Sequence, residues 1–112
     1  MTAPRTRRYP ELKPVDAFPG VVRRTLASGE RLTLVEIRFA PGAEVPEHTH
    51  PHEQAGHVAS GRVRLRIGAI EHDLSPGDSY LIPSGAPHYV RAADSATLIE
   101  AFSPVREDFA DD

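Results

Sequence analysis

Short runs that alternate apolar and polar residues, separated by turns rich in proline and glycine, are the feature that most constrains the fold of this chain. The clearest run is residues 62–67, in which Val63, Leu65 and Ile67 alternate with arginines. A period of two places the apolar side chains on one face of a strand and the arginines on the other. Residues 31–39 follow the same pattern. Both runs are therefore predicted to be β-strands with one buried face.

The remaining alternating runs extend this prediction to an all-β domain. Further strands are predicted over residues 54–59, 72–74, 79–82, 88–92 and 97–102. Strands that recur about every 8–12 residues between turns are typical of a β-sandwich or barrel. A length of 112 residues suits one domain. We expect an extended N-terminal arm over residues 1–20, a barrel over 21–106 and an acidic tail over 107–112.

Composition and charge exclude or disfavour several classes of function. The chain has no cysteine, which rules out disulfides, thiolate ligands and a cysteine nucleophile. A net charge of −3, with basic residues spread along the sequence, weighs against a nucleic-acid partner. No apolar stretch approaches the ~20 residues of a membrane span, and the first residues do not resemble a signal peptide. The chain is therefore predicted to be cytoplasmic, with no membrane partner.

A cluster of histidines is the strongest candidate for a functional site, because three of the six histidines lie within residues 48–52. On an extended segment His48 and His50 point to the same side, so both imidazoles can bind one ion. Pro51 favours a turn, after which Gln54 would return on a neighbouring strand with its carbonyl oxygen facing the same point. This pattern predicts a metal site.

A fourth ligand has to come from another part of the chain, and His88 is the natural candidate because it follows a rigid Pro/Gly turn. The alternative is that these histidines are solvated residues of polar loops. We prefer that alternative for His52, His57 and His72. His52 lies in the turn, His57 has the opposite strand parity to Gln54, and His72 lies in a remote hairpin.

The spacing of these residues resembles the two motifs of the cupin superfamily. The first motif is matched by Gly42, His48, His50, Gln54 and Gly61, and the second by Gly77, Pro83, Gly85 and His88. The resemblance implies a cupin barrel, also called a double-stranded β-helix or jelly roll, of the small single-domain type. It implies one divalent transition metal ion bound by His48, His50, Gln54 and His88.

Two positions depart from the common cupin pattern, which usually has Glu where this chain has Gln54 and Asn where it has Ala92. Three neutral imidazoles and a neutral amide leave the charge of the ion uncompensated. The ion is therefore expected to be a stronger Lewis acid and to favour anionic substrates. These ligand types suit Zn, Ni, Mn, Fe, Co or Cu alike, so the metal stays open.

Residues 100–109 are similar to the ending of small cupins that include the pectin degradation protein family, whose first motif also resembles residues 48–54. That family opens 4,5-unsaturated monouronates to linear keto forms. The other active-site positions of that family are an Asp, a Phe and an Arg. They fall on Glu100, Phe102 and Arg106 of this chain. The resemblance implies that Glu100 and Arg106 are catalytic and that Phe102 and Arg106 contact the substrate. The alternative is a structural salt bridge between Glu100 and Arg106.

Two other functions stay open for a cupin of this kind. One is an oxygen-using metal enzyme of the dioxygenase type, and the other is a non-enzymatic module that binds a small molecule. The outward arginines of residues 62–66 and the N-terminal arm predict pairing of two copies into a homodimer.

Overall fold

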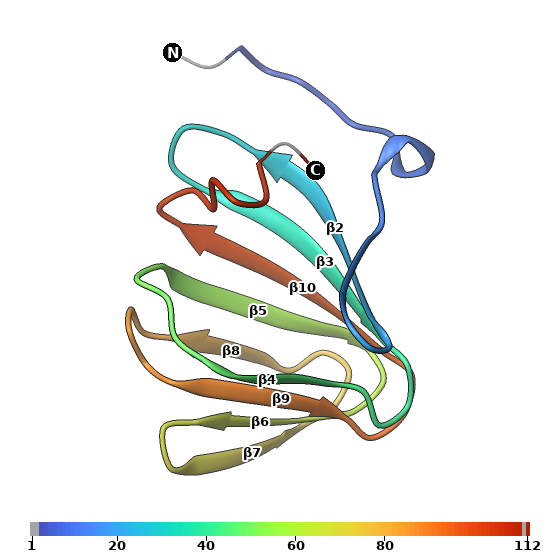
Figure 1. Cartoon of the computed structure of the whole chain (residues 1–112), viewed down its shortest axis with the longest axis vertical. Helices are drawn as coiled ribbons and strands as arrows, with labels where there is room; N and C mark the ends of the chain where they lie inside the picture. The colour runs from blue at the N-terminus through green and yellow to red at the C-terminus, as the bar shows by residue number, and fades with distance from the viewer. Residues whose placement is uncertain (1–2, 111) are drawn as a thin grey trace.

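The computed structural model describes residues 3–110 and 112, and its regular secondary structure is antiparallel β-strand apart from one short 3-10 turn (Figure 1). The larger sheet has the order β1 (Val15–Phe18), β2 (Val21–Ser28), β3 (Thr33–Phe39), β10 (Ala96–Ser103), β5 (Glu53–Ser60) and β8 (Ser79–Ile82). The smaller sheet has the order β4 (Glu44–His48), β9 (His88–Ala92), β6 (Val63–Ile67) and β7 (Ile70–Leu74). The predicted all-β architecture is confirmed.

The alternation seen in the sequence matches the burial of the strands. In β6, Val63 and Leu65 are buried and Arg64 between them is exposed. In β10, every second residue from Ala96 to Phe102 is buried. The buried side chains of both sheets form one hydrophobic core, which includes Val35 and Leu98 from the larger sheet. Removal of this apolar surface from water stabilises the two-sheet arrangement.

Three strands were not predicted from the sequence, namely β1, β2 and β4. β4 contains Pro46, which lacks an N–H donor, and the strand tolerates it because β4 lies at the edge of its sheet. β2 begins with adjacent pairs of like residues, Val21-Val22 and Arg23-Arg24, which hide the period of two. β1 lies within the predicted arm and pairs with β2. The division of the chain into arm, barrel and tail stays a prediction.

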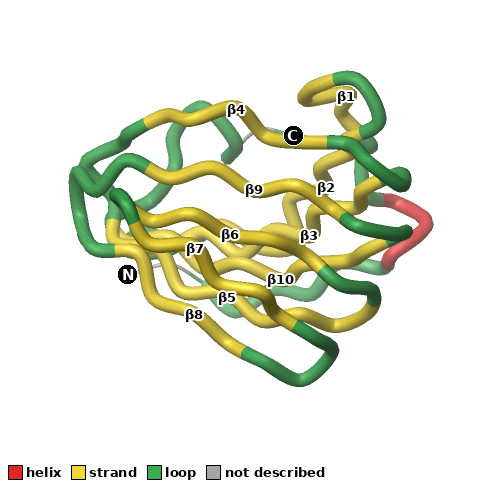
Figure 2. The backbone as a smooth tube through the Cα atoms, turned by 90° about the horizontal axis from the view of Figure 1, so that it is seen from below, coloured by secondary structure: helices red, strands yellow, loops and turns green. Residues whose placement is uncertain are grey.

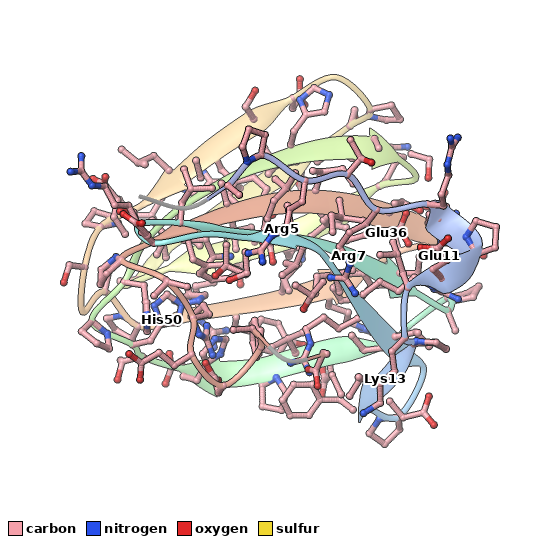
Figure 3. All side chains as sticks on the ribbon, turned by 90° about the horizontal axis from the view of Figure 1, so that it is seen from above. Arg5, Arg7, Glu11, Lys13, Glu36 and His50 are labelled. Carbon is pink, nitrogen blue, oxygen red and sulfur yellow. The ribbon has the colours of Figure 1, made fainter. Side chains whose placement is uncertain are left out.

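The N-terminal segment covers the outer face of β2 and β3. Tyr9, in the 3-10 turn η1 (Tyr9–Glu11), donates a hydrogen bond of 2.7 Å from its hydroxyl to Glu36, which is buried on that outer face. Arg7 donates to the backbone carbonyl of Thr25 at 2.8 Å. Figure 3 shows Arg5, Arg7 and Glu36 in this layer, with Glu11 at the opposite end of the molecule from His50. The 3-10 turn therefore lies away from His50.

The loops gather at the two ends of the strands, as Figure 2 shows. One of these ends carries the candidate site. Within residues 3–110 and 112, no helix is long and apolar enough to cross a membrane.

Candidate metal centre

His48, His50 and His88 form a cluster where the two sheets meet at one end of the barrel. This set is called the histidine cluster below. His48 ends β4 and is paired directly with His88, the first residue of β9. Gln54 lies on β5 in the other sheet, and His50 lies in the loop that connects the two sheets. From the sequence, Gln54 was expected on a strand next to the extended segment that carries His48 and His50. The structure instead places β4 and β5 in opposite sheets, so the residues approach one another across the barrel.

All four predicted ligand residues come together. The three histidines each offer a ring nitrogen, and these nitrogens lie within 4.8 Å of one another. The Nε2 atom of His50 is 3.0 Å from Oε1 of Gln54. Two nitrogens that bind one ion at about 2.1 Å are at most about 4.2 Å apart. Small inward movements of the rings therefore suffice to bring them to an ion.

Backbone carbonyls orient the three imidazole rings. Each ring directs its Nδ1 atom at a carbonyl oxygen: His48 at Pro46 (2.9 Å), His50 at His52 (3.1 Å) and His88 at Ala86 (2.9 Å). A carbonyl oxygen only accepts hydrogen bonds, so Nδ1 carries the proton in each ring. The lone pair is then on Nε2, the tautomer that an outer hydrogen bond selects in metal-binding histidines.

Two observations show that these residues fit a metal ion. Nε2 of His88 is buried and has no hydrogen-bond partner among the described residues. Nε2 of His50 faces Oε1 of Gln54, while the NH2 group of Gln54 donates to Glu100 at 2.6 Å. Both atoms of the His50–Gln54 contact thus present lone pairs. A divalent cation between them removes this repulsion and gives the His88 nitrogen a partner, whose absence costs about 1–3 kcal/mol.

Burial keeps two of the histidines neutral. The pKa of His88 is lowered to about 4, mainly by desolvation, with smaller contributions from the nearby His48 and His50 that the hydrogen bond to Ala86 opposes. Desolvation also lowers the pKa of His50, and the facing Oε1 atom of Gln54 opposes this change because it favours a proton on Nε2. Neutral imidazole is the form that binds metals. Protons therefore compete weakly for these two nitrogens at neutral pH.

Glu100 lies directly behind Gln54, and the strand parity predicted from the sequence is confirmed by the burial of Leu98, Glu100 and Phe102. Its Oε2 atom accepts hydrogen bonds from Nε2 of Gln54 at 2.6 Å and from the Tyr80 hydroxyl at 2.5 Å. Burial raises the pKa of Glu100, and the two hydrogen bonds partly oppose this rise. Tyr80 was not predicted as a site residue, because its only signal in the sequence was alternation with Leu81, which is exposed.

A cavity of about 240 Å³ opens beside the cluster. Six of the predicted site residues line it: His48, Gln54, His88, Glu100, Phe102 and Arg106. The Arg106 guanidinium lies 4.9 Å from the centre of the Phe102 ring and forms an ion pair of 2.8 Å with Asp108. In the described part of the chain no salt bridge joins Arg106 to Glu100, so the predicted structural alternative is not what the structure shows. Both side chains instead line the cavity.

Two cavity residues were given no role from the sequence, namely Phe109 of the C-terminal segment and Arg23 of β2. Phe109 and Arg23 line the cavity, and the Arg23 guanidinium lies 3.8 Å from the centre of the Phe109 ring. Thr25 Oγ1 donates to the backbone carbonyl of Phe109 at 2.9 Å. For Phe109 the signal in the sequence was its place at the end of residues 100–109, the stretch that resembles the ending of small cupins.

The other histidines lie outside the cluster. His57 and His72 are exposed, as expected. His52 is half-buried, and its ring contacts His50 and Phe102 at centroid distances of 5.4 and 6.4 Å. Its backbone carbonyl, rather than its ring, contributes to the site by orienting His50.

Comparison with known proteins gives close structural matches over nearly the whole chain. An RmlC-like cupin from Shewanella frigidimarina is 30% identical, with a TM-score of 0.90 and 96% of each chain covered. KdgF from Halomonas sp. is 30% identical, with a TM-score of 0.89 and coverage of 95% of this chain and 98% of that one. A curated germin-like protein (subfamily 1 member 7) from Arabidopsis thaliana is 34% identical over 86 residues, which is 67% of this chain. The match spans 34% of that plant protein, about a third of its length.

A family model assigns the chain to a family. The model of the cupin domain matches residues 35–102, which is more than half of the chain. The matched range begins at Val35 in β3 and ends at Phe102 in β10, and it includes the histidine cluster, Gln54 and Glu100. This chain belongs to the cupin family.

Proposed function

We propose that this cupin is a metal-dependent enzyme that opens the ring of a small anionic substrate, a 4,5-unsaturated uronate. The observation that carries the proposal is that Glu100, Phe102 and Arg106 share one cavity with three of the candidate metal ligands, His48, Gln54 and His88. The similarity to KdgF over nearly the full length of both chains supports it. Where the family is expected to have Asp, this chain has the longer Glu100, whose side chain still lines the cavity.

Charge and shape suit an anionic sugar. Arg106 and Arg23 place two guanidinium groups at the cavity. Arg106 is paired with the exposed Asp108, so a substrate carboxylate can replace that partner and form two parallel hydrogen bonds with the guanidinium. The flat ring of Phe102 gives the sugar an apolar wall. Binding in this pose directs the rest of the sugar toward the histidines.

A divalent ion bound by His48, His50, Gln54 and His88 supplies Lewis-acid stabilisation of negative charge on substrate oxygens. Ring opening removes a proton from the anomeric hydroxyl, breaks the bond between C1 and the ring oxygen, and adds a proton to C4. Glu100 carries this proton in our proposal. Both internal donors bind its Oε2 atom, which leaves Oε1 for the substrate.

The decisive experiment is turnover of an unsaturated monouronate by the metal-loaded protein. Loss of the ultraviolet absorbance of the conjugated double bond is expected, without oxygen uptake, and it should cease after chelation. The variants Glu100→Gln and Arg106→Ala should lose activity, whereas a variant at the exposed His72 should keep it.

The same assay distinguishes the rival functions. Oxygen uptake with an enol-type substrate would support the dioxygenase type. A ligand recovered unchanged after tight binding would support a binding module. Full turnover in Glu100→Gln would rule out the proton-transfer role. The identity of the metal, the homodimer and the cytoplasmic location stay predictions from the sequence.

A further inference from the structure

We propose that Tyr80 is a positioning residue, which acts through Glu100 to hold the Gln54 amide with its carbonyl oxygen, rather than its NH2 group, facing the metal-binding point. The proposal rests on the metal site described above but not on the sugar reaction. It assigns a function to a buried hydroxyl that sequence analysis did not single out.

The amide of Gln54 needs an external determinant of its orientation. A carboxamide turned by 180° has almost the same shape, so only its hydrogen-bond partners distinguish the two ends. The NH2 end can only donate hydrogen bonds, and it cannot ligate a cation. In the structure it donates to Glu100 at 2.6 Å, which turns Oε1 toward His50. The reverse orientation would place two oxygens in contact and direct an N–H group at the ion.

Tyr80 fixes the oxygen that receives this hydrogen bond. Its hydroxyl donates to the same Oε2 atom of Glu100 at 2.5 Å. A carboxylate on a flexible side chain would otherwise be free to turn within the cavity. With two donors on Oε2, the position of that atom is defined from both sides. An outer hydrogen bond of this kind commonly orients a metal ligand.

The strand register shows how a tyrosine reaches a residue two strands away. Gly56 on β5 is paired with Tyr80 on β8 and with Glu100 on β10. Two strand spacings amount to about 10 Å, which the two long side chains span together only if nothing stands between them. Gly56 has no side chain, and a Cβ there would overlap the Tyr80 ring. Gln54 lies two residues away on the same face of β5, next to the bridge.

A double-mutant cycle that combines Tyr80→Phe with Gln54→Ala, with Co²⁺ affinity as the measured quantity, tests the proposal. Tyr80→Phe keeps the ring over Gly56 and removes only the hydroxyl. We expect it to weaken Co²⁺ binding by about 10-fold in a chelator competition and to change the visible spectrum of bound Co²⁺. The matched control is Tyr9→Phe, which removes a tyrosine–glutamate hydrogen bond of 2.7 Å on the outer face of the barrel. This control should bind Co²⁺ like the wild type.

The Gln54→Ala background shows whether the effect passes through the amide. In that background Tyr80→Phe should cause no further loss of Co²⁺ affinity, because no amide remains to be oriented. The proposal would be overturned if Tyr80→Phe lowered Co²⁺ affinity equally in the wild-type and Gln54→Ala backgrounds. It would also be overturned if Tyr80→Phe bound Co²⁺ like the wild type while Gln54→Ala bound it weakly. Failure of the wild type to bind Co²⁺ would overturn the metal site itself, and the present proposal with it.

A spectroscopic test needs no variant to fold. The chain contains one glutamine and no asparagine, so Gln54 provides its only side-chain carboxamide NH2 signal in a ¹⁵N–¹H correlation spectrum. In the Zn²⁺-loaded wild type, one of the two protons should be shifted downfield and protected from exchange with solvent. An NH2 pair that exchanges as fast as a free glutamine would contradict the proposal.

Discussion

Gly56 lies opposite Tyr80 in the ladder between β5 and β8, and a Cβ atom built at Gly56 would overlap the tyrosine ring at Cζ, Cε2 and the hydroxyl oxygen. The backbone or the ring has to move to admit any side chain. We therefore expect Gly56→Ala to lower the free energy of unfolding by about 1–3 kcal/mol, measured by urea denaturation. Gly29→Ala is the matched control, because nothing lies within 4 Å of a Cβ there. A Gly56→Ala variant as stable as this control would contradict the overlap.

Loss of one candidate ligand should abolish stoichiometric metal binding. His88→Ala removes a buried nitrogen that no described residue satisfies. We expect the metal content of the purified variant, measured by elemental analysis, to fall from about one ion per chain to near zero. Loss of an outer hydrogen-bond partner already costs about 10–100-fold in metal affinity, and loss of a direct ligand should cost more. His72→Ala, at an exposed position, should keep its metal. Equal metal content in both variants would refute the site.

Asp108 is expected to compete with an anionic substrate for Arg106, because the two side chains form an ion pair of 2.8 Å beside the cavity. Asp108→Asn should lower KM for a uronate severalfold and leave kcat nearly unchanged. Stability should change by less than about 1 kcal/mol, because Asp108 is exposed. Asp73→Asn removes a comparable ion pair with Arg64 on the outer surface and should leave KM unchanged. A raised KM in Asp108→Asn would show that the ion pair positions Arg106 productively.

Tyr80 should make the protein sensitive to alkali. Burial, followed by the charge of Glu100 and the hydrogen bond to it, raises the pKa of Tyr80 well above 10.0. The folded state therefore retains this proton more tightly than the unfolded state. Its contribution to stability is fully present below about pH 10 and is lost as pH rises toward the pKa of the folded state.

Above pH 10 the free energy of unfolding should accordingly fall by up to about 1.4 kcal/mol per pH unit from this one group. Tyr80→Phe should show a flatter dependence in urea denaturation at a series of alkaline pH values. Identical slopes for the two proteins would indicate that Tyr80 ionises as readily in the folded state as in the unfolded one.

The sequence by itself determined most of the strands and their buried faces, because a period of two is a local property of the backbone. It also placed Glu100 and Phe102 on the inner face of one strand, and the motif spacing identified the four residues that come together around the candidate metal centre. Alternation does not reveal which strand lies beside which. The placement of His48 and Gln54 in opposite sheets was therefore decided by the tertiary structure.

Only the tertiary structure determined the surroundings of Gln54. Tyr80 and Glu100 are 20 residues apart, and Gln54 and Glu100 are 46 apart, so no local pattern links them. Their meeting depends on the order β8, β5, β10 and on a glycine in the middle strand. The sequence shows an amide at the position where the resemblance to cupins implies a carboxylate. Packing in three dimensions places a buried carboxyl group behind that amide, because hydrogen-bond partners follow strand order rather than sequence distance.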